Sequence, residues 1–121
     1  MIEMYGYKKC GSCKKTESFL HDSGLEFKFV DITENPPSFE ALKKMVSQSS
    51  LPIKKFFNTS GLQYRALNIK DLLPKASDDE LLELLSKNGR LIKRPILTNG
   101  EVTTVGAKAD DLERWARGSN L

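Results

Sequence analysis

The chain has little of what metal sites, secreted scaffolds and membrane proteins need. Its 121 residues include two cysteines, one histidine and one tryptophan. No apolar run approaches the roughly 18 residues that span a bilayer, and the first residues, 1–5, lack the basic and apolar regions of a signal peptide. Charge is balanced, with 19 Lys and Arg against 16 Asp and Glu. We therefore expect a cytoplasmic single domain over residues 1–121 that binds no membrane and no nucleic acid directly.

The two cysteines stand together as Cys10-Gly11-Ser12-Cys13, between an apolar segment and a helical pattern. A lasting disulfide is not expected in a reducing cytosol, so such a pair indicates transient redox chemistry, metal binding or an inert buried pair. A zinc site would need two further ligands, and the only histidine, His21, falls about two turns along the same predicted helix. We predict no metal site, a solvent-facing His21 and a redox-active CxxC.

The spacing of the cysteines suits thiol chemistry if the chain folds as strand, turn and helix at this point. Cys10 would then lie at a helix N-terminus, where free backbone N–H groups and the helix dipole stabilise a thiolate. Cys13 would lie one turn further on, within reach of a mixed disulfide on Cys10. Four nearby lysines at positions 8, 9, 14 and 15 add positive charge, although exposed lysines contribute little individually.

Hydrophobic periodicity and turn signals predict the elements along the chain. By residue number, these are a strand near 2–7, a helix over 12–23 that ends at Gly24, a strand at 27–30, a helix beginning at Phe39, short helical pieces at 56–57 and 64–73, a helix from the capping box at Ser77 to Gly89, a hairpin over 96–105 with a two-residue turn at Asn99-Gly100, a helix over 109–116 and a disordered tail at 117–121.

This order predicts an α/β fold. The first strand–helix–strand unit favours a right-handed crossover with parallel pairing, and the hairpin is antiparallel. We therefore expect a thioredoxin-like mixed four-stranded sheet flanked by helices. A helical insertion of about residues 36–90 would separate strands 2 and 3.

Arg94-Pro95 leads into the hairpin and is the second feature with chemical meaning. A guanidinium offers forked donors suited to arsenate, phosphate or a carboxylate, although a surface arginine before a strand-edge proline has the same sequence. Asn58-Thr59-Ser60-Gly61 is typical of a cap or turn.

Three blocks of the sequence together resemble the arsenate-reductase (ArsC)/Spx-like family of thioredoxin-fold proteins. They are Tyr5-Gly6-Tyr7-Lys8-Lys9-Cys10-Gly11-Ser12-Cys13-Lys14-Lys15, Lys55-Phe56-Phe57-Asn58-Thr59-Ser60-Gly61-Leu62-Gln63-Tyr64-Arg65-Ala66-Leu67 and Leu91-Ile92-Lys93-Arg94-Pro95-Ile96. The resemblance implies a catalytic thiol at Cys10, the family's arginine at Arg94 and a cis-proline at Pro95. Cys13 is then the expected resolving thiol. The expected substrate-binding positions are Gly11, Ser12, Lys14, Asn58 and Pro95.

The chain departs from both branches of that family. Arsenate reductases hold the oxyanion with three arginines, and Asn58 and Gly106 stand at two of those positions. Losing two charged donors at about 1.5–3 kcal/mol each would weaken oxyanion binding several hundred-fold or more. Gly6 stands where those enzymes carry a histidine. The Spx-like branch has a glycine at the position that Pro52 occupies here, and an arginine at the position that Ser60 occupies.

These observations predict a cytosolic thiol-disulfide oxidoreductase that acts on a small thiol, disulfide or oxyanion, with no bound cofactor. Glutathione, glutaredoxin or thioredoxin is the expected electron donor, and a redox protein is an expected partner. Two alternatives remain: a glutathione/glutaredoxin-dependent arsenate reductase, and a redox-sensing transcription regulator that binds the RNA polymerase alpha subunit.

Overall fold

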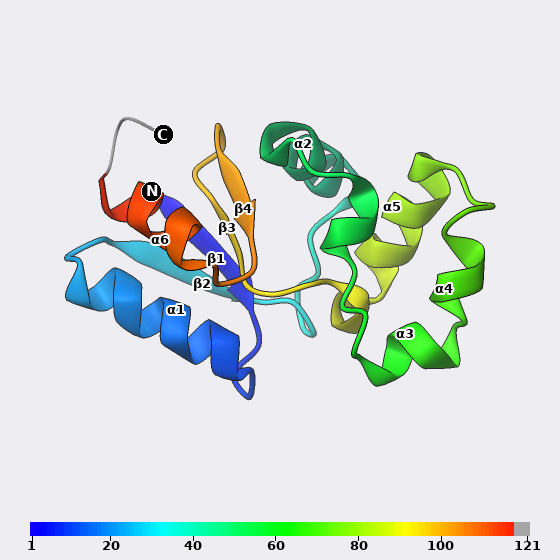
Figure 1. Ribbon diagram of the computed structural model, residues 1–121, viewed down its shortest axis with the longest axis horizontal. Helices are drawn as coiled ribbons and strands as arrows, with labels where there is room; N and C mark the ends of the chain where they lie inside the picture. Colours follow the sequence, from blue (N-terminus) through cyan, green and yellow to red (C-terminus); the bar gives the residue numbers. More distant parts are fainter. Residues whose placement is uncertain (118–121) are drawn as a thin grey trace.

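The computed structural model describes residues 1–117 (Figure 1). In chain order the elements, with η for 3-10 helices, are β1 (Ile2–Gly6), α1 (Gly11–Asp22), β2 (Phe27–Asp31), α2 (Phe39–Ser49), η1 (Ile53–Phe56), α3 (Leu62–Ala66), α4 (Ile69–Leu72), α5 (Asp78–Lys87), η2 (Gly89–Leu91), β3 (Ile96–Thr98), β4 (Thr103–Val105) and α6 (Ala109–Ala116).

The strands form one four-stranded sheet in the order β2-β1-β3-β4. β1 pairs parallel with β2, whereas β3 runs antiparallel to both β1 and β4. All helices from α2 to η2 lie between β2 and β3 in the sequence. The predicted thioredoxin-like mixed sheet with a helical insertion between strands 2 and 3 is therefore confirmed.

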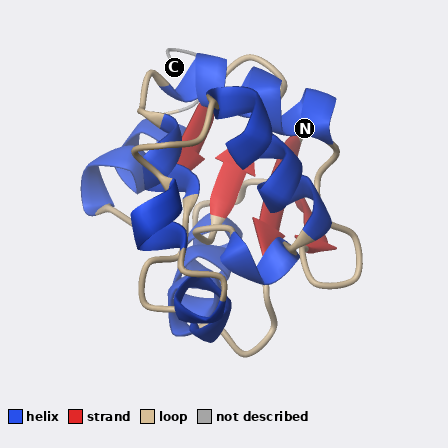
Figure 2. Ribbon diagram, turned by 90° about the vertical axis from the view of Figure 1, so that its right-hand side faces the viewer, coloured by secondary structure: helices blue, strands red, loops and turns tan. Residues whose placement is uncertain are grey.

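Helices cover both faces of the sheet. Successive strand residues point to opposite sides, so apolar side chains on each face need a covering layer. In β3, Ile96 packs into the core beneath the insertion, and Leu97 packs into the core beneath α1 and α6. Figure 2 views the molecule from the insertion side, with helices in front of the strands. The shared strands thus join the two hydrophobic clusters.

Side-chain hydrogen bonds and packing tie the insertion to the hairpin. α2 packs against α5 and β4. Gln48 on α2 donates through Nε2 to the Gly100 carbonyl at 2.6 Å, and its Oε1 accepts from the Thr103 hydroxyl at 2.9 Å. These contacts hold the helical part beside the sheet, so residues from both parts can line one cleft.

Several local predictions are confirmed. Ser77 and Glu80 form the predicted capping box at the start of α5. Gly24, after α1, has φ +71, the left-handed conformation that glycine adopts at helix ends. His21 is exposed, as predicted.

The predicted hairpin turn is wrong in its position. Thr98 pairs with Thr103, and the Asn99 N–H donates to the Val102 carbonyl at 3.2 Å, so the chain turns at residues 100–101 and not at 99–100. The Asn99 side chain accepts the backbone N–H groups of Glu101 and Val102 at 2.9 and 2.8 Å. This local hydrogen bonding holds Asn99 at the position before the turn, one residue away from the place that the Asn-Gly pattern predicted.

Three further expectations need correction. The helix predicted over 64–73 is split into α3 and α4, because Asn68 between them is left-handed, with φ 54. Phe57 leaves the helical piece predicted at 56–57 and forms an isolated β-bridge with Ile92. The helix stop predicted at Gly89 is confirmed, since α5 ends at Lys87; Gly89 itself begins η2, where a Cβ would lie 1.7 Å from the Ile32 carbonyl oxygen. Of the tail predicted at 117–121, Arg117 caps α6, and residues 118–121 lie outside the described residues.

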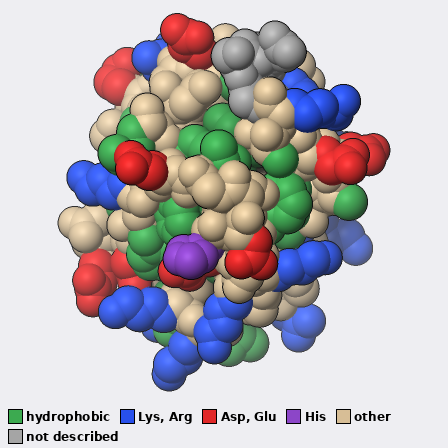
Figure 3. Space-filling model, turned by 90° about the vertical axis from the view of Figure 1, so that its left-hand side faces the viewer, with side chains coloured by type: hydrophobic (Ala, Val, Ile, Leu, Met, Phe, Trp, Pro, Cys, Tyr) green, Lys and Arg blue, Asp and Glu red, His purple; other side chains and the backbone are tan. Residues whose placement is uncertain are grey.

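None of the helices within residues 1–117 is both long enough and apolar enough to span a bilayer. On the face shown in Figure 3, Lys and Arg side chains are interspersed with Asp and Glu. That face therefore has the mixed charge expected from the composition.

Candidate active site

Cys10 is the N-cap residue of α1. The chain leaves β1 at Gly6, and the Cys10 N–H donates to the Tyr7 carbonyl at 3.1 Å, closing a turn. Cys10 itself is extended, with φ −89 and ψ 121, and its Sγ accepts the backbone N–H of Cys13 at 3.3 Å. The predicted placement of this sulfur at a helix N-terminus is confirmed, and the sulfur acts as the helix cap.

The surroundings of Cys10 favour its thiolate. Partial burial by itself raises the pKa, but the hydrogen bonds from the Cys13 side chain and backbone, together with the charge and hydrogen bonding of the Arg94 guanidinium, outweigh it. The net result is a pKa below the ordinary thiol value. Cys10 is half-buried and lines a cleft at the surface.

Cys13 has the opposite character. Its residue is 1% exposed. Burial, followed by its hydrogen bond to Cys10 and the charge there, raises its pKa to about 12. Both cysteines are free thiols. The pair therefore consists of an ionisable outer sulfur and a protonated inner one.

Gly6 provides the space that Cys13 occupies. A Cβ at Gly6 would lie 3.0 Å from the Cys13 Sγ and 3.3 Å from the Phe29 ring. A larger side chain would displace the sulfur or the ring. The glycine at this position and the buried second thiol are therefore sterically linked.

Arg94 lies beside the outer sulfur. The Arg94–Pro95 peptide bond is cis, and the Pro95 carbonyl accepts the Gly106 N–H at 2.8 Å. The guanidinium carbon lies 5.5 Å from the centroid of the Tyr7 ring, within cation–π range. Its Nη1 is buried and has no hydrogen-bond partner among the described residues. That nitrogen is available to an acceptor bound in the site.

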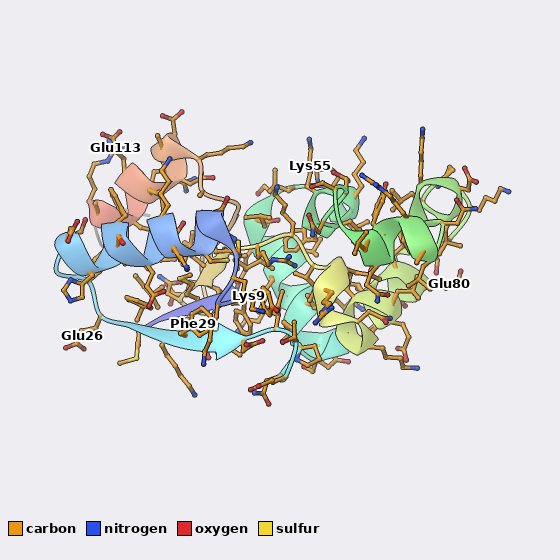
Figure 4. The ribbon with its side chains drawn as sticks, turned by 90° about the horizontal axis from the view of Figure 1, so that it is seen from below. Lys9, Glu26, Phe29, Lys55, Glu80 and Glu113 are labelled. Atoms are coloured by element: carbon orange, nitrogen blue, oxygen red, sulfur yellow. The ribbon has the colours of Figure 1, made fainter. Side chains whose placement is uncertain are left out.

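Cys10 opens into a cleft of about 570 Å³ between the start of α1 and the insertion. Lys9, the residue before Cys10, lies near the middle of the molecule, with Glu26 and Glu80 toward opposite ends (Figure 4). The cleft is lined by Tyr7, Cys10, Ser12, Thr33, Asn58, Ser60, Gly61, Leu62, Gln63, Arg90, Lys93 and Arg94. Within this lining there are three cations and no carboxylate.

Asn58 is held at the cleft by a short backbone pairing. Its N–H donates to the Leu91 carbonyl at 2.7 Å, and Lys93 N–H donates to the Phe56 carbonyl at 2.7 Å. The turn expected at 58–61 also forms, since the Gly61 N–H donates to the Asn58 carbonyl at 3.1 Å. This pairing places Asn58 next to the segment that carries Arg94, so both residues can line the same cleft.

The predicted site residues are thus distributed unevenly. Cys10, Ser12, Asn58 and Arg94 line the cleft, with Cys13 beneath Cys10. Gly11, Lys14 and Pro95 are not part of the lining. A Cβ on Gly11 would meet nothing within 4 Å, Pro95 is buried, and Lys14 borders a separate depression along α1 with Glu17 and His21. The structure does not bring Lys14 into the cleft.

Sequence reasoning missed Tyr7, Arg90 and Lys93 as lining residues. Lys93 adjoins Arg94, and Arg90 comes four residues earlier, so a cluster of positive charge beside the recognised arginine was the available signal. Tyr7 was noted at the end of a strand and in the first family block, without a role in the site. Within residues 1–117, no group of three or more His, Cys, Asp or Glu side chains lies close enough together to hold a metal ion.

Comparisons with known proteins agree on the kind of protein this is similar to. A model of the ArsC family matches residues 5–115. The uncharacterized Bacillus subtilis protein YusI is 50% identical over 116 residues, which cover 95% of this chain and 98% of YusI. A possible arsenate reductase from Streptococcus mutans has a TM-score of 0.86 and 39% identity, covering 93% of this chain and 98% of that one. The global transcriptional regulator Spx of Listeria innocua is 27% identical, covering 95% of this chain and 86% of Spx.

Proposed function

The chain belongs to the ArsC family of thioredoxin-fold proteins, and from this we propose that it is a thiol-disulfide oxidoreductase with Cys10 as nucleophile and Cys13 as resolving thiol. One observation carries the proposal: the Cys10 Sγ caps α1 at 3.3 Å from the Cys13 N–H, with its pKa lowered while that of Cys13 is raised. The two sulfurs are therefore suited to different steps.

In the first step, the Cys10 thiolate attacks one sulfur of a substrate disulfide. A bond forms between Cys10 and that sulfur, the substrate S–S bond breaks, and the departing thiolate takes a proton from water. Since Cys10 then carries no charge, one of the causes that raise the pKa of Cys13 disappears.

In the second step, Cys13 loses its proton and attacks the Cys10 sulfur. The Cys10–Cys13 disulfide forms and the second substrate thiol leaves, so the substrate gains the two electrons that the protein loses. A thiol donor, which we propose is glutathione or a glutaredoxin or thioredoxin, would reduce the pair by the reverse exchange. We propose that this cycle operates in the cytoplasm, where such donors are reduced.

The test is to mix the reduced protein with 2-hydroxyethyl disulfide, quench with acid, alkylate the remaining thiols and determine masses over time. We expect native protein to lose two alkylation sites together, Cys13→Ser to accumulate one mixed disulfide, and Cys10→Ser to stay unmodified. Oxidation of Cys10→Ser at the native rate would contradict the assignment of the nucleophile.

Arsenate reduction is the second candidate, favoured by the buried Arg94 Nη1 that has no partner within the described residues. Asn58 lines the cleft at one of the positions where the resemblance would place an arginine, so the three-arginine set of an arsenate site is incomplete. We expect at most slow arsenite production when the protein is incubated with arsenate, glutathione and glutaredoxin. Steady turnover there would favour the reductase over the general oxidoreductase.

A redox-sensing regulator is the remaining alternative, supported by the 27% identity to Spx. The test is capture of the C-terminal domain of the RNA polymerase alpha subunit by the reduced and the Cys10–Cys13 oxidised protein. Binding that changes with oxidation would favour this role. Pro52, where the resemblance implies a glycine for polymerase contact, is exposed at the start of η1.

A further inference from the structure

The cleft has a charge character that the reaction by itself does not need. Arg90, Lys93 and Arg94 all come from the segment that runs from η2 toward β3, and all three line the cleft. The ion pairs within residues 1–117 are Lys87–Glu83 and Arg114–Asp111. The three cations of the cleft therefore form no ion pair with a carboxylate of the described residues.

The size of the cleft points to an organic molecule rather than a lone oxyanion. Its volume of about 570 Å³ falls within the roughly 300–1,000 Å³ of small-molecule sites. Thr33, Asn58 and Gln63 also line it, and their hydroxyl and amide groups can bond to a substrate along its length.

The cations have separate tasks. Arg94 acts on the Cys10 thiolate and stacks on Tyr7, so it belongs to the reacting end of the cleft. Arg90 and Lys93 are exposed and do not contribute to the lowered pKa of Cys10. Arg90 also borders the neighbouring depression with Thr33 and Gln63, which extends the groove away from the sulfur.

We propose that Arg90 and Lys93 form a carboxylate subsite, so that the protein selects disulfides carrying carboxylates at a distance from the reacting sulfur. This inference rests on the proposed oxidoreductase function and names its substrate class. The reaction is the one already described: Cys10 receives one half of the acidic disulfide, and both halves leave as thiols while Cys10 and Cys13 become a disulfide.

The experiment measures second-order rate constants for oxidation of reduced protein by three small disulfides: 3,3′-dithiodipropionate, which is dianionic, 2-hydroxyethyl disulfide, which is neutral, and cystamine, which is dicationic. Their leaving thiols differ in pKa, so each rate is divided by that of dithiothreitol with the same compound. We expect the normalised order acidic, neutral, basic. Raising the salt from about 0.02 M to about 0.5 M should shrink the differences, since exposed charges are screened.

Variants locate the selectivity. Arg90→Gln and Lys93→Gln should each lower the acidic-to-neutral rate ratio by about two- to fivefold, the range of exposed charge interactions. Lys43→Gln removes an equal charge from an exposed position of α2 outside the cleft and should leave the ratio unchanged. Circular dichroism verifies that each variant is folded, and the salt series on native protein needs no variant.

The outcomes separate the two levels of the proposal. If all three disulfides oxidise the cysteines but normalised rates show no preference for the acidic compound, or Lys43→Gln lowers the ratio as much as Arg90→Gln, the carboxylate subsite is overturned while the oxidoreductase stands. If none of the disulfides oxidises Cys10, both fall.

Discussion

At the scale of single residues, the chemistry depends on an asymmetry between two identical side chains three positions apart. Cys10 lies at the surface of the cleft because it caps α1. Cys13, in the first turn of α1, points into the hydrophobic cluster between the sheet and the helices α1 and α6. The backbone N–H of the inner residue then stabilises the outer sulfur at 3.3 Å. The same helix therefore exposes and activates one thiol and shields the other.

The first prediction concerns the pH dependence of Cys10. Only the thiolate reacts with iodoacetamide, so the alkylation rate rises with pH through the pKa of Cys10. Because that pKa is lowered, we expect the midpoint below that of an unperturbed cysteine thiol measured in the same way. Arg94→Gln removes a stabilising charge, so the midpoint should move upward and the rate at pH 7 should fall by about three- to tenfold.

A matched change shows whether this effect is local. Lys43→Gln lowers the net charge equally from an exposed position on α2 and should leave the alkylation profile in place. A midpoint at or above that of free cysteine in the native protein would contradict the thiolate assignment.

The second prediction is that Tyr7 positions the Arg94 guanidinium beside Cys10. Its ring lies under the Arg94 guanidinium at 5.5 Å, a contact worth about 0.5–2 kcal/mol in proteins. Tyr7→Leu should loosen Arg94, shift the alkylation midpoint of Cys10 upward and slow the reaction at pH 7 by about two- to fivefold. Tyr7→Phe keeps the ring and should retain the native profile. Equal effects of the two substitutions would argue against the stacking role.

At the scale of elements, the site depends on how closely η2 approaches the end of β2. Gly89 meets the backbone of Ile32 there, and this contact places the segment that continues to Lys93 and Arg94. Residues 91–93 in turn pair with residues 56–58, which sets Asn58 at the cleft. The cationic side of the site is therefore positioned by backbone contacts.

The third prediction tests this approach. In Gly89→Ala the new Cβ would lie 1.7 Å from the Ile32 carbonyl oxygen, and neither backbone can move without breaking its own contacts. We expect a loss of about 3 kcal/mol or more in the free energy of unfolding, measured by urea denaturation. Gly11→Ala, whose Cβ would meet nothing within 4 Å, should be tolerated. A native-like stability of Gly89→Ala would contradict the close packing.

At the scale of the whole molecule, one sheet serves two hydrophobic clusters. One cluster lies beneath α1 and α6, and the other lies between the sheet and the insertion. Neighbouring residues of β3 point into different clusters. Since neither cluster can lose the strand without exposing the other, we expect the two to unfold together.

The fourth prediction follows from that shared strand. Trp115, the only tryptophan, is on the buried face of α6, and its indole donates to the Thr104 hydroxyl at 2.8 Å. Its fluorescence therefore reports on one side of the sheet, whereas far-UV circular dichroism also reports on the insertion helices. We expect coincident urea transitions by the two probes. Separate transitions would show that the insertion unfolds by itself and that residues 1–121 are not one cooperative unit.

Much of the architecture could be predicted because local signals and the global fold agree. Apolar periodicity, the capping box at Ser77 and Gly24 after α1 located elements, and the order of those elements restricted the sheet to a few topologies. Two errors have local causes: Asn68 adopts a left-handed conformation that breaks a predicted helix, and the Asn99 side chain shifts a predicted turn. One has a long-range cause, since the bridge of Phe57 to Ile92 removes Phe57 from the predicted helical piece.

The sequence by itself determined that two thiols at CxxC spacing begin a helix after a strand, since strand, turn and helix signals are contained within a few neighbouring residues. It also carried the family resemblance. Only the tertiary structure decided which sulfur is buried, that Tyr7 stacks on Arg94, that Lys14 lies outside the cleft, and that Arg90 and Lys93 line it without a carboxylate. The cleft features depend on segments some fifty to ninety residues apart, which meet because they pack on or beside a shared sheet.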